Sequence, residues 1–271
     1  MTARYGIIGY PLGHTMSPVL HNWGFGQFGL DARYEAWPLE PEGLSAFIER
    51  VRTDDIRGVS VTIPHKRTVM EFLDRITDRA KAVGAVNTLY WDGGELCGEN
   101  TDVIGLVAPL RKLARPASAL VLGAGGAARA AVAGLLELGI GDVAVANRTA
   151  SKADSLAQDF NVRAIPWENR MDHAPGLICN TTPLGMAGAM EDRTPWDADR
   201  FPAGCIAYDI VYNPLETRFL REAREAGCAT VSGLEMFLHQ GLAQFALWTR
   251  LNMDEECARV LLLDALAGKR S

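Results

Sequence analysis

The chain has 271 residues, enough to bury a large core and close to the length at which single cores give way to two domains. Its content of 48% hydrophobic and 22% charged residues is that of an ordinary globular protein, and its net charge of −6 gives no support for a nucleic-acid partner. No signal-peptide pattern precedes the first strand-like run, and no apolar segment is long enough to span a bilayer. We therefore expect a soluble, cytoplasmic protein with two domains and no membrane partner.

The cysteines and histidines show no pattern of a metal or redox site. The cysteines are odd in number and widely spaced, without a C-x-x-C pair, which predicts free buried thiols at Cys97, Cys179, Cys205, Cys228 and Cys257. The histidines lack metal-ligand spacing, so no metal is expected.

The N-terminal part alternates strand-like and helix-like segments, which indicates an α/β domain. Strands are expected over residues 5–8, 33–37 and 58–63, and helices over 19–28 and 41–51. Pro18 fits the first turn of the first helix, with Ser17 as its cap. Capping and turn geometry explain this stretch as well as a ligand does, so the residue types alone leave both interpretations open.

The third strand leads into a second group of polar residues. It places Thr62 and Lys66 near its carboxyl end, where open α/β sheets form ligand crevices. A lysine at a helix start opposes the helix dipole, which favours a binding role for Lys66 over a surface charge. Residues 81–90 are expected to form a strand, followed by a glycine turn, a return strand over 95–99 and a helix that Thr101 or Asp102 caps.

The stretch 119–129 changes from an apolar run to glycines and then to alanine-rich sequence, which predicts strand, tight turn and helix. Its spacing is G-x-G-x-x-A: Gly123 permits the turn, Gly125 lets a pyrophosphate approach the backbone, and Ala128 lets the helix pack closely on the strand. A helix over 127–138 and a strand over 143–146 complete a βαβ unit. The sequence therefore predicts a dinucleotide site at Gly123, Ala124, Gly125, Gly126 and Ala127.

The end of the second strand of this unit indicates which dinucleotide is bound. Sites for NAD usually carry an acid there for the ribose 2′-hydroxyl, but this chain has Asn147, Arg148, Thr149 and then Lys152. Two cations and two small hydrogen-bonding side chains suit a 2′-phosphate, which predicts NADP. The alternative is a solvated loop that caps the helix from Ser151.

The C-terminal part continues the same alternation. Strands are expected over residues 177–180, 205–211 and 229–231, and helices over 217–226, 233–248 and 255–266. The first two of these strands end in loops on the same sheet edge as the glycine turn. These loops contain Thr182, Met186 and Tyr212.

Seven motifs, read together, resemble the shikimate dehydrogenase family in content and order, over nearly the whole chain. They are His14-Thr15-Met16-Ser17-Pro18, Val61-Thr62-Ile63-Pro64-His65-Lys66, Gly84-Ala85-Val86-Asn87-Thr88, Asn100-Thr101-Asp102, the glycine turn Gly123–Arg129, Asn147-Arg148-Thr149, and Gly233–Gln240.

The resemblance implies a mixed α/β fold with three parts. Residues 1–102 would form a substrate-binding and catalytic domain, residues 103–236 a Rossmann-type, doubly wound NADP-binding domain, and residues 237–271 helices that return to the first domain. The active site would lie in the cleft between the domains. The implied reaction is the NADP-dependent, reversible reduction of 3-dehydroshikimate to shikimate by a monomer or homodimer.

The resemblance also implies roles for individual residues. Lys66 and Asp102 would form the catalytic pair, and Thr15, Ser17 and Tyr212 would hold the substrate carboxylate. The ring hydroxyls would bind Thr62, Asn87 and Gln240. The cofactor would contact the glycine turn, the residues from Asn147 to Lys152, Thr182, Met186 and Gly233.

One departure from the family pattern concerns Thr15, where the family usually has serine. The added methyl affects the shape of the carboxylate pocket and the preference between shikimate and quinate. Two other functions stay open from the sequence: an NAD-linked quinate/shikimate dehydrogenase, and a non-catalytic metabolite or nucleotide sensor on the same fold. The missing acid at Asn147 speaks against the first, and the presence of Lys66 and Asp102 speaks against the second.

Overall fold

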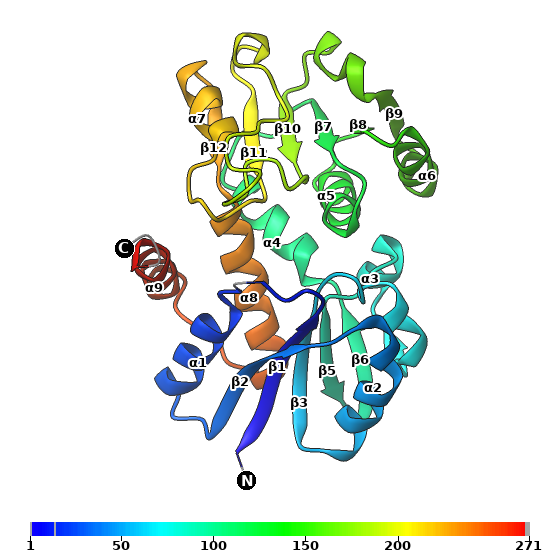
Figure 1. The fold of residues 1–271 in the computed structure, drawn as a ribbon, viewed down its shortest axis with the longest axis vertical. Coiled ribbons are helices and arrows are strands. Elements are labelled where there is room, and N and C mark those ends of the chain that lie inside the picture. The colour runs from blue at the N-terminus through cyan, green and yellow to red at the C-terminus, as the bar shows by residue number, and fades with distance from the viewer. Residues whose placement is uncertain (1, 14, 269–271) are drawn as a thin grey trace. The chain divides into compact units, whose positions relative to one another are not determined.

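The computed structural model describes residues 2–13 and 15–268 of the chain, and His14 of the first motif lies outside the described residues. The chain divides into two compact units, which are described separately. Unit 1 comprises Met1–Thr101 and Gln240–Ser271, and unit 2 comprises Asp102–His239. In Figure 1 unit 1 is blue to cyan with an orange and red C-terminal part, and unit 2 is green to orange.

Unit 1 is built on a six-stranded mixed sheet with the strand order β2-β1-β3-β5-β6-β4. β1 pairs in parallel with β2 and β3, whereas β5 is antiparallel to β3 and β6. Its elements are β1 (Ala3–Gly9), α1 (Ser17–Gln27), β2 (Ala32–Pro38), the 3₁₀ helix η1 (Pro41–Gly43), α2 (Leu44–Thr53), β3 (Ile56–Val61), the 3₁₀ helix η2 (Thr68–Phe72), β4 (Arg75–Ile76), α3 (Asp78–Val83), β5 (Thr88–Asp92), β6 (Glu95–Glu99) and α9 (Glu255–Gly268).

Segments from both ends of the chain cover this sheet. α2 buries Phe47, Ile48 and Val51 in a cluster with sheet residues such as Val59 and Leu89. The C-terminal half of α8 (Gly233–Thr249) packs closely on the sheet as well: Trp248 donates a hydrogen bond to the Leu89 carbonyl at 2.9 Å, and a Cβ on Gly58 would lie 2.3 Å from the Trp248 indole. The sheet of unit 1 therefore requires residues from beyond unit 2 in the sequence.

The structure corrects three expectations in unit 1. Residues 81–83 are helical rather than extended, because α3 is capped by the Thr77 hydroxyl and ended by Gly84 in the left-handed conformation. Ser17 is the first helical residue of α1, so it does not cap the helix. Lys66 lies in a turn before a 3₁₀ helix and not in the first turn of an α-helix.

Unit 2 is built on a six-stranded, fully parallel sheet with the strand order β12-β11-β10-β7-β8-β9. This is the doubly wound order, in which the direction of winding reverses between β7 and β10. The fold class expected from the sequence is confirmed. The elements are α4 (Thr101–Leu110), β7 (Ser118–Leu122), α5 (Gly126–Glu137), β8 (Asp142–Asn147), α6 (Ala150–Phe160), β9 (Arg163–Pro166), η3 (Trp167–Asp172), β10 (Leu177–Asn180), η4 (Ala198–Arg200), β11 (Ile206–Asp209), α7 (Arg218–Glu225) and β12 (Ala229–Val231).

The alternating side chains of this sheet form two cores, one on each face. Val121, Val145 and Tyr208 pack in one core with α5 and α6, and Leu120, Ala144 and Ile178 pack in the other with α7. Strands buried on both faces explain the continuous apolar runs in the sequence. The short strand β9 was not expected from the sequence.

The cysteines are free thiols, as expected, but Cys257 is exposed and not buried. It lies in the first turns of α9, where the helix leaves one face uncovered. The four others are buried, and two of them, Cys205 and Cys228, come into contact.

Candidate active site

At the sheet edge where β3 ends and the antiparallel strand β5 begins, backbone hydrogen bonds bring Thr62, Lys66 and Asn87 together. Val61 donates to the Asn87 carbonyl at 2.8 Å, and Val86 donates to the Lys66 carbonyl at 2.7 Å. Thr62 and His65 close the intervening turn through a backbone bond of 3.0 Å. Thr62 and Lys66 are half-buried, and Asn87 is buried. These three side chains therefore start from one small region of the unit.

The Asn87 amide is held by a dense set of hydrogen bonds. Its oxygen accepts from the Thr101 N–H and from the Thr88 hydroxyl, both at 2.8 Å. Its nitrogen donates to the Thr101 hydroxyl at 3.0 Å. The amide orientation is thereby fixed before any ligand arrives, which is what a substrate-positioning group requires. The family motifs predicted a role for Asn87 but gave no sign that Thr88 and Thr101 hold it.

The position of Gln240 in the site can be inferred from that of Gln244, four residues later in α8. The Gln244 side chain is buried and donates to the Thr88 hydroxyl at 3.0 Å and to the Asn87 carbonyl at 3.3 Å, while its oxygen accepts from Ser60 at 2.9 Å. Residues four apart lie on the same face of a helix. Gln240 therefore lies one turn before Gln244 on the face of α8 that Gln244 turns toward Asn87.

Thr15 and Ser17 form a small hydroxyl pair at the start of α1. The Thr15 hydroxyl accepts from the Ser17 N–H at 3.2 Å and donates to the Ser17 hydroxyl at 3.1 Å. Two hydroxyls at a helix N-terminus, where the dipole favours negative charge, suit a carboxylate.

Asp102 is the first residue of unit 2 and follows Thr101, whose backbone and side chain are bonded to Asn87. It lies in the first turn of α4 and its side chain is buried. The sequence placed Thr101 and Asp102 as candidate caps of this helix. In the structure Thr101 begins the helix, and the Asn87 side chain accepts its N–H.

The glycine turn of unit 2 fits a dinucleotide. Gly123 has φ +119°, and a Cβ there would lie 2.4 Å from the Thr181 hydroxyl, so the turn requires glycine. Among the described residues nothing lies within 4 Å of a Cβ built on Gly125, which leaves space next to the backbone for a phosphate. Within the same part of the chain no side chain caps α5 at Gly125, so its first N–H groups are available to an anion.

The turn lies where the strand order reverses, between β7 and β10, which is the ligand position in doubly wound sheets. Ala128 is fully buried against the sheet, as the spacing predicted. At the end of β8, Asn147 donates to the Thr149 carbonyl at 2.9 Å, and Arg148, Thr149 and Lys152 are exposed. The exposed side chains of Arg148 and Lys152 at this strand end are therefore accessible to a phosphate group.

A buried carboxyl group connects the loops that follow β10 and β11. Asp209 accepts hydrogen bonds from the Thr217 hydroxyl at 2.6 Å, the Asn180 amide at 2.9 Å and the Val211 N–H at 3.0 Å. Burial raises the pKa of Asp209 to about 7, against the effect of these three donors. Sequence analysis missed this residue; the available signal was an acid at the end of an apolar strand.

Asn180 also anchors the loop that carries Thr182. Its oxygen accepts from the Thr182 N–H at 3.0 Å and the Thr182 hydroxyl at 2.7 Å. Further along this loop the Met186 side chain is exposed. In the loop after β11 the Tyr212 ring lies 5.0 Å from that of Phe237, and burial raises the pKa of Tyr212.

Gly233 belongs to the same edge of unit 2. A Cβ there would lie 2.3 Å from the Ile210 carbonyl oxygen, so glycine lets α8 begin against the loop after β11.

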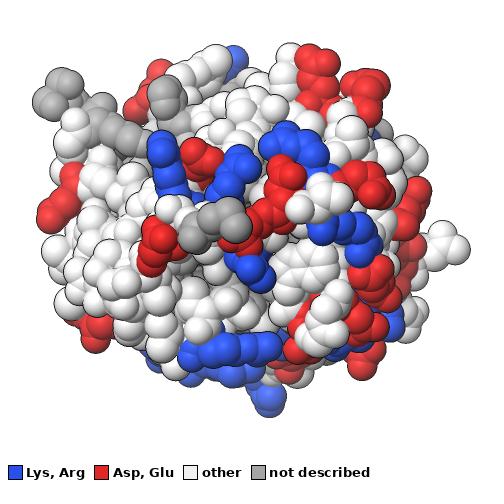
Figure 2. Space-filling view, turned by 90° about the horizontal axis from the view of Figure 1, so that it is seen from below, with Lys and Arg blue, Asp and Glu red and all other residues white. Residues whose placement is uncertain are grey.

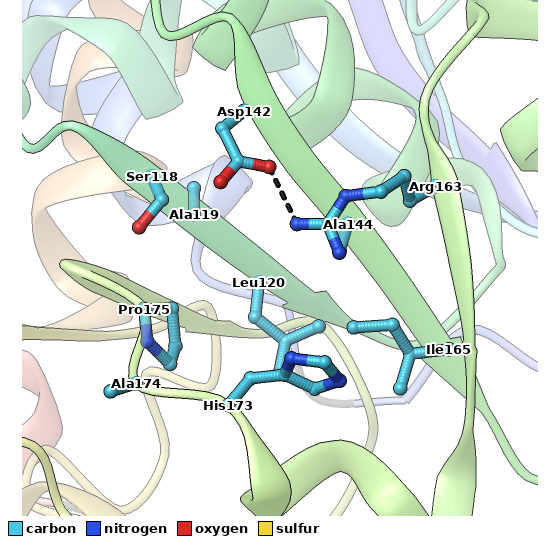
Figure 3. Close-up of a pocket in the computed structure, with 10 residues that line it drawn as sticks. All are labelled: Ser118, Ala119, Leu120, Asp142, Ala144, Arg163, Ile165, His173, Ala174 and Pro175. Carbon is cyan, nitrogen blue, oxygen red and sulfur yellow. Dashed lines mark hydrogen bonds and ion pairs between the residues drawn. The ribbon is translucent and has the colours of Figure 1, made fainter.

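A pocket at the opposite, amino edge of the unit 2 sheet is separate from these loops. It is lined by the first residues of β7, β8 and β9, including Ser118, Asp142 and Arg163, with His173 beside them (Figure 3). An ion pair of 2.5 Å joins Arg163 to Asp142. With a volume of about 120 Å³ the pocket is far smaller than the 300–1,000 Å³ typical of a ligand site.

Acidic and basic side chains are interspersed over the face shown in Figure 2. Ion pairs of unit 1 include that of Arg52 with Asp74 at 2.9 Å. Among the described residues, no helix combines the length and the apolar character that crossing a bilayer requires.

A doubly wound sheet with a glycine turn at its switch point, together with a second α/β unit that carries clustered polar side chains, is typical of dinucleotide-dependent oxidoreductases. Three family models match the chain: the shikimate dehydrogenase substrate-binding domain over residues 7–89, shikimate/quinate 5-dehydrogenase over 110–175, and the shikimate 5′-dehydrogenase C-terminal domain over 233–259. The chain belongs to the shikimate dehydrogenase family, which confirms the resemblance seen in the sequence.

Individual relatives agree with this assignment. A shikimate dehydrogenase (NADP⁺) of Maridesulfovibrio salexigens is 52% identical over 97% of both chains, and one of Pelobacter propionicus is 50% identical over 97% of this chain and 96% of the relative. A solved shikimate 5-dehydrogenase of Thermus thermophilus, in complex with NADP(H) and shikimate, superposes with a TM-score of 0.88 at 38% identity over 97% of this chain and 99% of the other.

Proposed function

We propose that this protein catalyses the NADP-dependent, reversible reduction of 3-dehydroshikimate to shikimate. The observation that carries the proposal is 52% identity, over 97% of the chain, to a relative that bears the name of this activity. It is an oxidoreductase of the shikimate pathway, which leads to aromatic amino acids.

Unit 2 supplies the cofactor site in this proposal. The Gly123–Ala127 turn binds the pyrophosphate through backbone N–H groups, and Arg148 and Lys152 bind the 2′-phosphate. Thr182 and Met186, on the loop that Asn180 holds, contact the nicotinamide in this proposal, and Gly233 lets the backbone approach the cofactor closely. The bound cofactor supplies or accepts the hydride.

Unit 1 supplies the substrate site. Thr15 and Ser17 hold the carboxylate, with Tyr212 of unit 2 as a further donor. Asn87, Thr62 and Gln240 bind the ring hydroxyls, and the fixed amide of Asn87 selects their orientation. These contacts orient the carbonyl carbon that receives the hydride.

Lys66 and Asp102 move the proton. When the carbonyl carbon gains a hydride, its oxygen needs a proton at once, and the Lys66 ammonium donates it. Asp102 is the second member of the proposed catalytic pair. In the reverse direction Lys66 takes the proton back.

The test is a steady-state assay of the purified chain that follows the absorbance of the reduced nicotinamide. Shikimate and quinate are each offered with NADP and with NAD. Turnover of shikimate with NADP above the other three combinations supports the proposal. Preference for quinate or NAD identifies the other dehydrogenase, and absence of turnover with all four combinations indicates a sensor.

Arg148→Ala is expected to weaken NADP binding about ten- to a hundred-fold and to change NAD binding much less. Charge-assisted hydrogen bonds to a 2′-phosphate are worth roughly 1.5–3 kcal/mol, and only NADP carries that group. Dissociation constants of both cofactors are measured by calorimetry for the wild type and the variant. Arg163→Ala, at the other edge of the same sheet, is the matched control and is expected to bind both cofactors normally. Equal losses for NADP and NAD would remove the basis for this role of Arg148.

Thr15→Ser is expected to leave shikimate turnover largely intact and to improve acceptance of quinate. Only a methyl is removed beside the carboxylate, an effect of roughly 1 kcal/mol. Thr15→Val is the matched variant: it keeps the methyl and loses the hydroxyl that bonds Ser17, so we expect a far larger rise in the KM for shikimate. Kinetics of both variants with both substrates check this. Complete loss of activity in Thr15→Ser would show that the role of Thr15 is misassigned.

A further inference from the structure

Two thiols of unit 2 approach each other at the amino ends of neighbouring strands. The Sγ atoms of Cys205 and Cys228 are 2.7 Å apart. Cys205 directly precedes β11 and Cys228 directly precedes β12, and the following residues, Ile206 and Ala229, are paired in the parallel register. The contact therefore follows from strand pairing and not from a chance meeting of flexible side chains.

The backbone on both sides of the pair is fixed. Ala229 donates to the Cys205 carbonyl at 3.1 Å, and Cys228 donates to the Ala223 carbonyl at the end of α7 at 2.9 Å. Each cysteine follows a glycine with positive φ, +70° at Gly204 and +82° at Gly227, which directs the chain into its strand. Two side chains on such anchored neighbours need little movement to form a bond.

From this geometry we propose that Cys205 and Cys228 are a modification site, a thiol pair that a peroxide converts into an intramolecular disulfide. Cys228 is the more exposed residue of the two, at 7% against 1% for Cys205, and we assign its sulfur the first reaction with the oxidant. Burial raises the pKa of the Cys205 thiol, so this partner brings its proton to the second step.

The step balances with hydrogen peroxide as the oxidant. The Cys228 sulfur attacks one peroxide oxygen, the O–O bond breaks, and a sulfenic acid and one water form. The Cys205 sulfur then attacks the sulfenic sulfur, the S–O bond breaks, and the hydroxyl leaves as a second water with the Cys205 proton. The two thiols lose two electrons, and the peroxide gains them.

The disulfide would covalently link the residues that precede β11 and β12, at the edge of the unit 2 sheet. β12 has three residues and lies at the end of the strand order, paired with β11. A bridge between residues 23 positions apart restricts the unfolded chain and so stabilises the folded one. Because the pair lies at the amino ends of the strands, away from the glycine turn, this inference does not depend on the proposed function.

The experiment treats the full chain with hydrogen peroxide in a Cys257→Ser background, which removes the exposed thiol. The protein is then denatured, alkylated and analysed by intact mass and peptide mapping. We expect a mass loss of two hydrogen atoms, a linked peptide that contains Cys205 and Cys228, and alkylation of Cys97 and Cys179. The melting temperature is expected to rise by several degrees and to return to its starting value with dithiothreitol.

Two single variants serve as controls. Cys205→Ser and Cys228→Ser, each in the same background, are expected to show neither the linked peptide nor the reversible rise in melting temperature. The proposal is overturned if Cys205 and Cys228 remain alkylatable after peroxide has oxidised Cys257 in the wild type. It is also overturned if Cys228 advances to a sulfinic acid without a link, or if the link joins another pair.

Discussion

Lys66→Ala is expected to lower turnover by about 10²–10⁴-fold, the usual contribution of a positioned acid or base. Alanine leaves no proton donor at the carbonyl oxygen, so hydride transfer would build an alkoxide without a proton source. NADP binding is expected to stay nearly unchanged, since Lys66 belongs to unit 1 and the glycine turn to unit 2. Steady-state kinetics with shikimate and NADP, over a range of pH, measure the loss.

Lys81→Ala is the matched control for this variant. Lys81 is an exposed lysine of α3 in the same unit, and its removal is expected to leave kcat near the wild-type value. Calorimetric titration with NADP and circular dichroism separate a catalytic loss from unfolding. A Lys66→Ala enzyme with near-normal kcat and an unchanged pH profile would contradict the proposed role of Lys66.

Asp209→Asn is expected to remove a pH dependence of stability from unit 2. The folded pKa of Asp209, about 7, lies above the ordinary value of 3.8, so between these values the folded state holds a proton that the unfolded state has lost. The free energy of unfolding therefore falls as the pH rises from about 4 to about 7, by up to roughly 4 kcal/mol for a shift of this size. Asparagine cannot ionise and still offers an oxygen to the neighbouring donors.

Urea denaturation of the wild type and the variant at about pH 5 and about pH 8 measures this difference. The wild type is expected to lose stability between these pH values, and Asp209→Asn is expected to lose less. Asp199→Asn, an exposed acid of the same unit, is the control and is expected to follow the wild type. Identical pH dependence in Asp209→Asn and the wild type would show that Asp209 is ionised in the folded protein at both pH values.

The sequence predicted those parts of the fold that depend on local patterns. The glycine turn from Gly123 is one example, because a positive φ and a close approach to Thr181 permit only glycine there. The buried parallel strands are another, because their apolar runs are continuous. The helix α3 was missed although local signals existed: the Thr77 cap and the left-handed Gly84 outweigh the β-branched residues that follow.

By itself the sequence determined the fold class, the family, the dinucleotide turn and the chemical types of the site residues. Each of these depends on short, continuous segments, in which neighbouring residues set the local backbone conformation. The tertiary structure decided which distant groups meet. It alone brings Gln244 to the backbone of Asn87, places Thr101 and Thr88 around the Asn87 amide, buries Asp209 among three donors, and joins Cys205 to Cys228. These contacts join residues up to 157 positions apart, and only the packing of strands and helices into one sheet and core determines such distances.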